Sequence, residues 1–423
     1  MSWFLFEGED SFDVDVYHDA MVLFSGSSYI LQRFPPTDNH SLKAVSAADQ
    51  HLLNWCAGEL KDHPQIPHLH GVPLVLHDRF GALSIPLAGG RKVLRTLILS
   101  QSQEHSIKAN LEENHIAENH CQFERPFSNN SIPFEREIHP PSLPSMLAPW
   151  AMIRIPKSLE LWEFYLEYLV KNLHPEGLVG AGFMTKYFTP KLLKIAQKYF
   201  HHVHQGQAWK KSRILFLSHP KEIREEQSLI TIERKGTSCL QQLPGVFSSQ
   251  KVDDATTFLL ETFHKYENLC PKHGRILDLG CGNGVIAQEL SKLAPNAEIH
   301  GMDDQWLAVL SAQFNCSDSI QLHWEHSPFA LGCSLAGEPQ SGVPWSPPFQ
   351  MIVTNPPFHL EHEIDLSLPL RLFFESRRIL EPGGSLIVVG NRHLNYSTHL
   401  QKAFASCRVL RQNKKFEILQ ARV

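Results

Sequence analysis

A glycine-rich turn between an apolar run and a helical pattern is the feature that most constrains how this chain folds. Arg275–Leu279 is a short apolar run that carries one carboxylate, Asp278. The next five residues read Gly-Cys-Gly-Asn-Gly, and Val285–Leu293 then repeats its apolar residues with the spacing of one helix face. Glycine lets the backbone turn sharply and approach a ligand without a Cβ atom in the way. The order strand, tight turn and helix predicts the opening of a nucleotide-binding βαβ unit.

Two carboxylates flank this turn and indicate which ligand it would hold. A second expected strand, Ala297–Met302, ends at Asp303, about 20 residues past the glycines, where an acid is placed to hydrogen-bond a ribose diol. Asp278 suits a ligand with a cationic amino-acid part, because a carboxylate would repel a pyrophosphate. Each acid has a plainer alternative, since an Asp at a strand end often only caps the following helix.

A second motif follows in the same half of the chain. Gln350–Val353 is a short apolar run that leads into the sequence TNPPFH, which begins at Thr354. This segment resembles the N-P-P-F motif of S-adenosylmethionine-dependent methyltransferases that modify exocyclic amines. A rigid strand-to-loop turn is the alternative use of its two prolines. Because the motif comes after the glycine-rich turn and the acidic strand end, we interpret the three together as a methyltransferase site.

The composition of the whole chain is that of a globular protein. Its 423 residues suggest two or three domains, and 42% hydrophobic with 20% charged residues suffices to bury cores. The net charge of -5 argues against a wide basic footprint for nucleic acid. Eight scattered cysteines without a C-x-x-C pair indicate no zinc framework and a reducing compartment. With neither a signal peptide nor a membrane-spanning run visible, we expect a cytoplasmic protein without membrane contact.

The two halves of the chain resemble each other when they are offset by about 200 residues. The first copy keeps the apolar runs but lacks the polar side chains of the motifs, because Leu76 falls where Asp278 lies and Ile155 replaces Asn355. Only Gly81 remains of the glycine cluster. Two unrelated α/β domains are the alternative. The matching pairs are Pro73–Leu83 with Arg275–Val285, Ile153–Lys157 with Val353–Pro357, and Ala208–Leu215 with Gln412–Leu419.

This repeat predicts an α/β protein of two tandem Rossmann-like class I methyltransferase domains, of which the N-terminal one is degenerate and binds no cofactor. Residues 119–149, rich in Pro, Ser and Asn, are expected to form a surface loop. The predicted divisions are an N-terminal extension over 1–29, the degenerate domain over 30–217, a linker over 218–244 and the catalytic domain over 245–423.

The chain resembles the bacterial ribosomal RNA guanine-N2 methyltransferases, in which two duplicated domains carry one active site, and it is most similar to the 23S large-subunit branch. It departs from that family after Gly245–Ser248, where Ser249 replaces an Arg and Ala255-Thr256 replaces Gly-Ser. It also departs where Trp324-Glu325-His326 stands in place of an Asn or Asp near the adenine, and where the segment Phe329–Phe349 is longer than expected and rich in Pro and Gly. The resemblance rests on Leu31–Asp38, Ala47–Leu53, Phe80–Ser84, Ala208–Lys211, Gly245–Ser248, Asp278–Val285, Asn355–His359 and Asn391–Tyr396.

The resemblance implies S-adenosyl-L-methionine as cofactor, no metal, and three groups of site residues. The catalytic group is Asn355, Pro356, Pro357 and Phe358. The cofactor group is Asp278, Gly280, Gly282, Asn283, Gly284, Asp303, Glu325, His326, Phe247 and Asp253. The RNA-binding group is Lys210, Lys211, Arg392, Lys414 and Lys415.

The expected reaction is attack of a guanine N2 on a sulfonium methyl group. The side-chain oxygen of Asn355 and the carbonyl of Pro356 would accept hydrogen bonds from the amine and stabilise its developing positive charge. Phe358 would stack on the base, which must leave the stack of a structured ribosomal RNA to react. The chain is expected to act as a monomer.

Other functions stay open at this point. One is amine methylation on another target, such as a 16S rRNA guanine N2, an adenine N6 or a protein glutamine. Another is a non-catalytic RNA-binding factor in ribosome assembly, which would not need an intact cofactor site. Cofactor binding separates the second from the rest.

Overall fold

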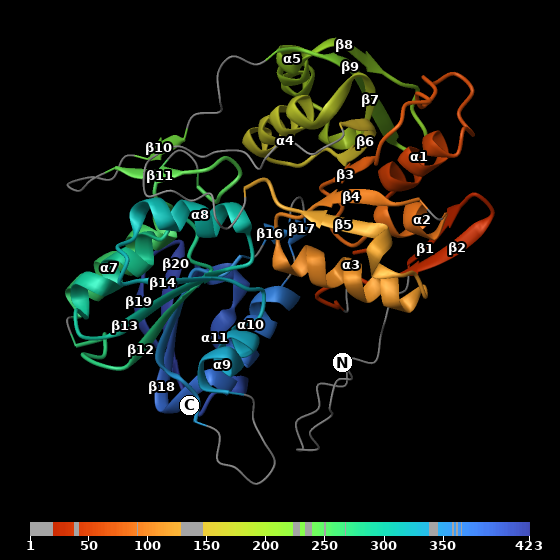
Figure 1. The fold of residues 1–423 in the computed structure, drawn as a ribbon. Helices are drawn as coiled ribbons and strands as arrows, with labels where there is room; N and C mark the ends of the chain where they lie inside the picture. Colours follow the sequence, from red (N-terminus) through yellow and green to blue (C-terminus); the bar gives the residue numbers. More distant parts are fainter. Residues whose placement is uncertain are drawn as a thin grey trace.

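The protein consists of two halves of the same architecture, each a seven-stranded mixed sheet with helices on both faces (Figure 1). The computed structural model describes residues 20–37, 42–90, 92–127, 147–222, 229–232, 239–248, 251–266, 268–337, 346–357, 359–360, 363–364 and 366–423. Phe358, which the sequence places in the catalytic group, lies outside these residues.

The N-terminal sheet has the strand order β5-β4-β3-β6-β7-β9-β8, in which β9 runs antiparallel to the other six strands. Helices α1, α2 and α3 pack on one face, and α4 and α5 pack on the other. The elements are β3 (Leu74–Leu76), β4 (Leu94–Leu97), β5 (Cys121–Glu124), β6 (Ala148–Arg154), β7 (Leu173–Met184), β8 (Phe200–Gln205), β9 (Ser212–Pro220), α1 (Ala47–Cys56), α2 (Ser84–Gly89), α3 (Gln101–Glu113), α4 (Leu159–Asn172), α5 (Pro190–Tyr199), and the short 3-10 helices η1 (Glu118–His120) and η2 (Thr185–Tyr187).

The C-terminal sheet has the order β14-β13-β12-β15-β18-β20-β19, in which β20, the counterpart of β9, runs antiparallel to the other six strands. Helices α6 and α7 cover one face, and α9, α10 and α11 cover the other. The elements are β12 (Arg275–Leu279), β13 (Glu298–Asp303), β14 (Gln321–Trp324), β15 (Phe349–Thr354), β18 (Leu380–Asn391), β19 (Ser406–Gln412), β20 (Phe416–Arg422), α6 (Asp254–Lys265), α7 (Val285–Leu293), α8 (Trp306–Asn315), α9 (Pro328–Ala336), α10 (Ser367–Ile379), α11 (Tyr396–Ala403) and η3 (Arg392–Leu394).

The two sheets correspond strand for strand, which confirms the predicted fold class. Leu76 pairs with Ile153 in the first sheet, and Asp278 pairs with Val353 in the second, as the alignment of the two halves places them. Strands β7 and β18 each have 12 residues, of which the third and fourth are exposed and the fifth to eleventh are buried. Long buried runs of this kind are typical of central strands covered on both faces.

Three two-stranded hairpins lie outside the two large sheets in the described part of the chain. The first joins β1 (Ala20–Phe24) to β2 (Ser27–Leu31) and packs through Val22, Phe24 and Leu31 onto the core beneath α1, α2 and α3. The others are β10 (Ile230–Ile232) with β11 (Leu240–Gln242), and β16 (His359–Leu360) with β17 (Glu363–Ile364).

One predicted loop is partly ordered as a strand. Within residues 119–149, Cys121–Glu124 forms β5 at the edge of the N-terminal sheet, and Ala148 begins β6. The prediction of a continuous surface loop was therefore wrong for these residues. The polar residues of this run misled the prediction, because an edge strand hydrogen-bonds through its backbone on one side only and keeps part of its surface exposed.

The two halves meet through corresponding segments. Ser100 and Gln305, which are the N-cap residues of α3 and α8, form an antiparallel bridge, and α8 adds Trp306 and Leu307 to the apolar core around α4 and α5. Since α3 follows β4 as α8 follows β13, the same position of the fold contacts its counterpart in the other copy. This junction has the character of a pseudo-twofold interface.

Candidate active site

The predicted site residues gather at one edge of the C-terminal sheet. Strands β13, β12 and β15 are neighbours and run parallel, so their carboxyl ends lie side by side. Asp303 ends β13, the glycine-rich turn follows β12, and Asn355 follows β15. The hydroxyl of Thr354 donates a hydrogen bond of 2.8 Å to the carbonyl of Leu279, which fixes the start of the Asn-Pro-Pro segment beside the turn. A carboxyl edge of this kind is where open α/β sheets bind ligands.

The three glycines of the turn are required for two different reasons. All have positive φ angles, of 77° at Gly280, 55° at Gly282 and 81° at Gly284. A Cβ atom at Gly280 or Gly282 would meet no atom within 4 Å, so the backbone faces open space there. A Cβ atom at Gly284 would lie 2.6 Å from the sulfur of Cys316. The first two glycines therefore leave a backbone cradle open for a ligand, and the third allows close packing of α7.

Asp278 is fully buried and holds the start of α7 in place. One carboxylate oxygen accepts a hydrogen bond of 2.9 Å from the backbone N–H of Ala287, while the other has no partner within the described part of the structure. Burial raises the pKa of Asp278 to about 7, and the nearby charge of Asp303 also raises it. The helix-capping alternative considered from the sequence is thus present, and the second oxygen is left as an acceptor beneath the turn.

Asp303 connects the turn to the next loop of the site. Its carboxylate accepts hydrogen bonds from the backbone N–H of Gly282 at 2.9 Å and of Gln305 at 2.8 Å. Burial is the main cause that raises the pKa of Asp303 to about 6. Cys281, between the glycines, is buried, and burial raises the pKa of its thiol well above the usual value, which disfavours a nucleophilic thiolate.

The side-chain amide of Asn355 has a defined orientation. Its Nδ2 donates hydrogen bonds to the carboxylate of Asp253 at 3.2 Å and to the hydroxyl of Thr256 at 3.1 Å. The Asp253 carboxylate also accepts from the N–H groups of Ala255 and Thr256, as the N-cap of α6. An ionised carboxylate only accepts hydrogen bonds, so the nitrogen of the amide must face it. The oxygen of Asn355 is therefore turned away from α6 and is available as an acceptor.

The N-terminal copy makes a corresponding tether with different chemistry. Arg154, the last residue of β6, donates hydrogen bonds to Ser46 and Asp49 at the start of α1. This guanidinium joins a strand end to a helix N-terminus, as Asn355 joins β15 to α6. Because a guanidinium has no acceptor atom and Ile155 stands at the position of Asn355, the first copy lacks the side-chain acceptor that Asn355 provides.

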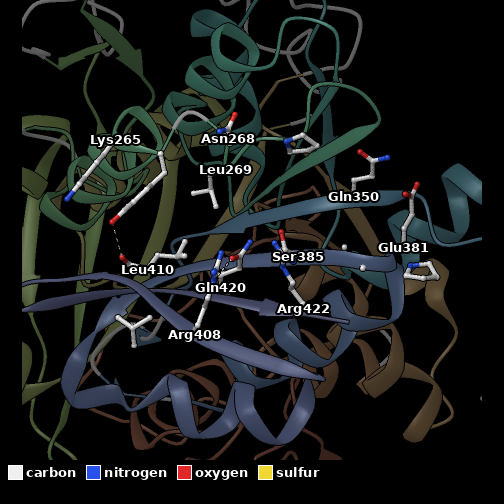
Figure 2. A pocket seen from close by; sticks show the side chains of 16 residues that line it. Lys265, Asn268, Leu269, Gln350, Glu381, Ser385, Arg408, Leu410, Gln420 and Arg422 are labelled. Carbon is white, nitrogen blue, oxygen red and sulfur yellow. Dashed lines mark hydrogen bonds between the residues drawn. The ribbon is translucent and has the colours of Figure 1, made fainter.

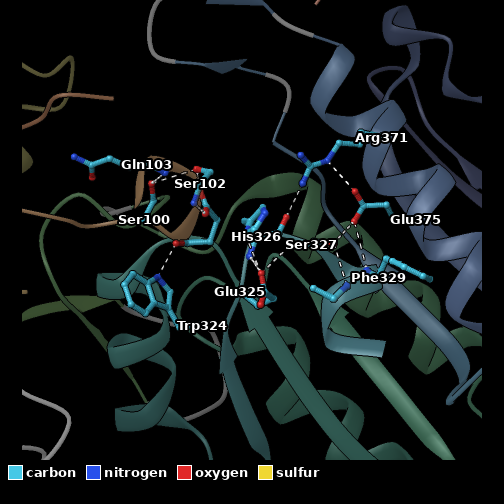
Figure 3. A network of polar contacts seen from close by, with 12 residues as sticks. Ser100, Ser102, Gln103, Trp324, Glu325, His326, Ser327, Phe329, Arg371 and Glu375 are labelled. Atoms are coloured by element: carbon cyan, nitrogen blue, oxygen red, sulfur yellow. Dashed lines mark hydrogen bonds and ion pairs between the residues drawn. The ribbon is translucent and has the colours of Figure 1, made fainter. Parts of the chain in front are cut away.

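Glu325 and His326 lie at the end of β14, directly beside Asp303. The backbone N–H of Glu325 donates to the carbonyl of Asp303 at 3.1 Å, and the Glu325 carboxylate accepts from the backbone N–H of His326 at 2.7 Å (Figure 3). Burial acts to raise the pKa of Glu325, but the hydrogen bonds and charge of His326 outweigh it and lower this pKa below the usual value. The His326 ring contacts His105 of the N-terminal half, with ring centroids 4.9 Å apart.

Each of the two halves of the chain matches a known protein family. Residues 238–420 match the family model described as methyltransferase small domain, and residues 20–221 match the RLMG N-terminal domain. The ribosomal RNA large subunit methyltransferase G of Klebsiella pneumoniae subsp. pneumoniae is 31% identical over 402 residues, which cover 94% of this chain and 96% of that protein. This chain belongs to the ribosomal RNA large subunit methyltransferase G family. The predicted resemblance is confirmed, and with it an rRNA methyltransferase as the class of enzyme.

Other relatives and one solved structure extend this result. Family members of Psychromonas ingrahamii and Vibrio vulnificus are each 30% identical, and the matches cover 93% and 92% of this chain and 96% of each relative. The T. thermophilus 16S rRNA N2 methyltransferase RsmC, solved with AdoMet and guanosine, superposes with a TM-score of 0.68 at 19% identity, over 96% of this chain and 97% of its own. The fold and the methyltransferase domain agree with S-adenosyl-L-methionine as cofactor.

Two residues that hold the candidate site together were not predicted from the sequence. Gln242, fully buried, accepts a hydrogen bond of 2.9 Å from the side chain of Asn283 in the glycine-rich turn. It falls in the segment predicted as a linker, where a lone Gln gives no signal. Thr256 accepts a hydrogen bond from Asn355, and the only hint in the sequence was its position where the family usually has Ser.

Phe247, which was predicted in the cofactor group, lies on the loop after β11, and 67% of it is exposed.

The predicted RNA-binding residues lie on corresponding turns of the two halves. Lys210 and Lys211 form the turn between β8 and β9, and Lys414 and Lys415 form the turn between β19 and β20. Arg392 is tied to the second turn, because its backbone N–H donates to the carbonyl of Lys415 at 3.0 Å. All five side chains are exposed. The structure therefore brings three of them together in the C-terminal domain and places the other two in the N-terminal domain.

A separate surface pocket of about 990 Å³ lies at the opposite edge of the C-terminal sheet (Figure 2). Gln350 near the start of β15, Glu381 at the start of β18 and Arg422 at the end of β20 line it, and none of the predicted site residues does. Among the described residues, no cluster of His, Cys, Asp or Glu has the arrangement of a metal site. In the same part of the chain, no helix has the length and apolar character needed to cross a membrane.

Proposed function

We propose that this family member transfers a methyl group from S-adenosyl-L-methionine to the exocyclic N2 of a guanine in 23S rRNA. Its relatives are large-subunit methyltransferases by name, and RsmC is a 16S rRNA N2 methyltransferase that was solved with AdoMet and guanosine. The orientation of the Asn355 amide carries the proposal. A fixed oxygen acceptor at this edge suits a reaction in which an amine gains positive charge.

Asn355 and the prolines act on the attacking amine. An exocyclic amine is a weak nucleophile, because its lone pair is delocalised into the base. Acceptance by Asn355 Oδ1 and by the Pro356 carbonyl favours tetrahedral geometry at the nitrogen and stabilises the charge that develops there. Pro356 is buried and Pro357 restricts the backbone, so the acceptors stay aimed. Phe358 stacks on the base in this proposal. S-adenosyl-L-methionine, when bound, supplies a methyl group on a sulfonium centre, and the transfer leaves S-adenosyl-L-homocysteine and one proton.

The cofactor fits the open cradle at the turn. Asp303 accepts hydrogen bonds from the ribose, and Asp278 stabilises the amino-acid end through its unpaired oxygen. The backbone of Gly280 and Gly282 has the space that a ligand requires. In the same proposal Asn283 and Gly284 shape the turn, Asp253 positions Asn355, Phe247 covers the site, and Glu325 and His326 border the adenine.

The RNA contacts follow from the exposed cations. We assign the flanking RNA backbone to Lys210 and Lys211 in one domain and to Arg392, Lys414 and Lys415 in the other, because phosphates favour exposed Lys and Arg. The target guanine must leave its stack to reach Asn355. The protein works in the cytoplasm as a monomer in this proposal, and its eight free cysteines agree with a reducing compartment.

The test is single-turnover methylation of 23S rRNA at saturating cofactor. Asn355→Ala removes an acceptor that acts in the transition state, so we expect a rate about 100-fold lower or more, with little change in cofactor affinity. A rate close to that of the parent protein would show that Asn355 is not the amine acceptor. Absence of cofactor binding by the parent protein would instead favour the non-catalytic assembly factor.

A further inference from the structure

The loop that carries Asp303 is held from outside its own domain. This loop, Asp303–Gln305, joins β13 to α8. The carboxylate of Asp303 bonds inward to the glycine-rich turn, whereas that of Asp304 reaches the N-terminal half. There it accepts hydrogen bonds from the backbone N–H of Ser102 at 2.7 Å and from the Ser102 hydroxyl at 2.6 Å. Two adjacent acids thus link the proposed ribose contact to the degenerate domain.

Backbone hydrogen bonds fix the same loop on both sides. The N–H of Gln101 donates to the carbonyl of Asp304 at 3.1 Å, and the N–H of Trp306 donates to the carbonyl of Leu99 at 2.7 Å. The indole N–H of Trp324 donates to the Asp304 carbonyl at 2.8 Å. The loop therefore has few conformations available while the two domains are docked.

The contact between Asp304 and α3 is electrostatically favourable. Gln101 and Ser102 begin α3, a helix of 13 residues whose N-cap is Ser100. A carboxylate near the first turn of a helix satisfies N–H groups without intrahelical partners and interacts with the positive end of the helix dipole. Hydrogen bonds to an ionised acceptor are roughly twice as strong as neutral ones. A carboxylate of the catalytic domain thus stabilises a helix of the degenerate domain.

Residues of the N-terminal half also contact the end of β14 and the loop that follows it. The ring of Phe34 lies 5.3 Å from that of His326, and the guanidinium of Arg125 lies 4.1 Å from the ring of Trp324. Phe34 and Arg125 belong to the N-terminal half. The degenerate domain therefore contacts both loops that border the ribose and adenine positions of the proposed cofactor site.

We propose that the degenerate domain positions the cofactor site, with Ser102 as a positioning residue that acts through Asp304 on the ribose contact at Asp303. This inference rests on the proposed role of Asp303 in ribose binding. Docking keeps the loop in the conformation that accepts the ribose, so cofactor affinity depends on the domain junction. By thermodynamic reciprocity, bound cofactor must stabilise the junction by the same free energy.

A double-mutant cycle in the full chain tests the coupling. We expect Ser102→Ala and Asp304→Ala each to weaken S-adenosyl-L-methionine binding by roughly 3-fold to 30-fold in calorimetry, because only part of the free energy of a hydrogen bond to a charged group is passed on to the cofactor site. The double variant should bind no more weakly than Asp304→Ala, because Asp304→Ala already removes the hydrogen bond from the Ser102 hydroxyl together with the one from its backbone N–H. The rate at saturating cofactor should stay near the parent value. Ser158→Ala, which removes the serine cap of α4 in the same domain, is the matched control and should leave affinity unchanged.

The variant Asp303→Asn distinguishes the proposed role of Asp303 in ribose binding from the proposed positioning role of Ser102. If Asp303→Asn weakens cofactor binding while Ser102→Ala and Asp304→Ala do not, the ribose role stands and the positioning role is wrong. If Asp303→Asn also has no effect, the ribose role in the proposed function is wrong. Weakening by all three, with an unaffected Ser158→Ala, supports the positioning role.

Hydrogen exchange on the unmutated protein gives an independent readout. The amides of Gln101 and Ser102 donate across the junction, although both belong to the domain without a cofactor. We expect saturating S-adenosyl-L-methionine to slow their exchange. Unchanged exchange at these two amides would contradict the coupling, whatever the variants show.

Discussion

The hydrogen bonds that the Asn355 side-chain nitrogen donates determine how a substitution at this position changes the methylation rate. A carboxylate at this position keeps two acceptors but meets Asp253, whose oxygen now lies 3.2 Å from the amide nitrogen. Like charges this close disfavour ionisation and break the tether. We therefore expect Asn355→Asp to methylate no faster than Asn355→Ala near neutral pH.

A second change should restore part of the activity. Asp253→Asn supplies a donor in place of the repelling carboxylate and keeps a good N-cap for α6. The double variant Asn355→Asp/Asp253→Asn should react faster than Asn355→Asp alone in the single-turnover assay. Equal rates for the two would show that the tether from Asp253 does not orient the Asn355 amide.

The proposed contact of Asp303 with the ribose predicts that cofactor binding depends on pH. Its raised pKa of about 6 means that the free carboxyl gains a proton as the pH falls through 6, and the neutral acid is a poorer partner for the ribose. Affinity should be full above about pH 7 and decline through this pKa as the pH falls to about 5. Calorimetry should show the decline in the parent protein and a smaller one in Asp303→Asn, which binds more weakly at every pH. A parallel decline in both would assign the titration to another group, such as Asp278.

At the scale of elements, the packing of α7 against α8 depends on one glycine. Gly284→Ala would place a methyl group 2.6 Å from Cys316 and 3.1 Å from Ala312 at a φ of 81°. We expect the free energy of unfolding to fall by about 2–4 kcal/mol, because backbone strain adds to overpacking. Gly383→Ala is the control, since its φ is 80° and no atom lies within 4 Å. The thermal midpoint should fall more for Gly284→Ala, and equal shifts would mean that α7 moves freely to make room.

The elements of the site differ in how far the sequence predicts them. The strand, turn and helix around Gly280–Gly284 follow from local patterns, as does the acid at the end of β13. The four residues of β5 are too few to show a strand pattern in the sequence. They form a strand because their backbone pairs with β4 at the edge of the sheet. The contact of Ser102 with Asp304 joins residues 202 positions apart in different domains, and no local pattern encodes it.

At the scale of the molecule, two domains of one fold should bind one cofactor. The N-terminal copy has Leu76 where the other has Asp278, and its strand β6 ends in the Arg154 tether rather than in a free amide oxygen. We expect a calorimetric stoichiometry of one S-adenosyl-L-methionine per full chain. A value of two would show that the degenerate domain still binds the cofactor.

The bridge between Ser100 and Gln305 is the kind of contact that two identical subunits make across a dyad. Here both partners belong to one polypeptide, so their local concentration is on the order of millimolar and does not fall on dilution. The junction, which combines polar contacts with an apolar core shared by both halves, therefore does not need the strength that would hold separate subunits together at cellular concentrations. Covalent linkage also frees each half from the need to stay identical, so one can specialise in catalysis while the other serves as its fixed neighbour.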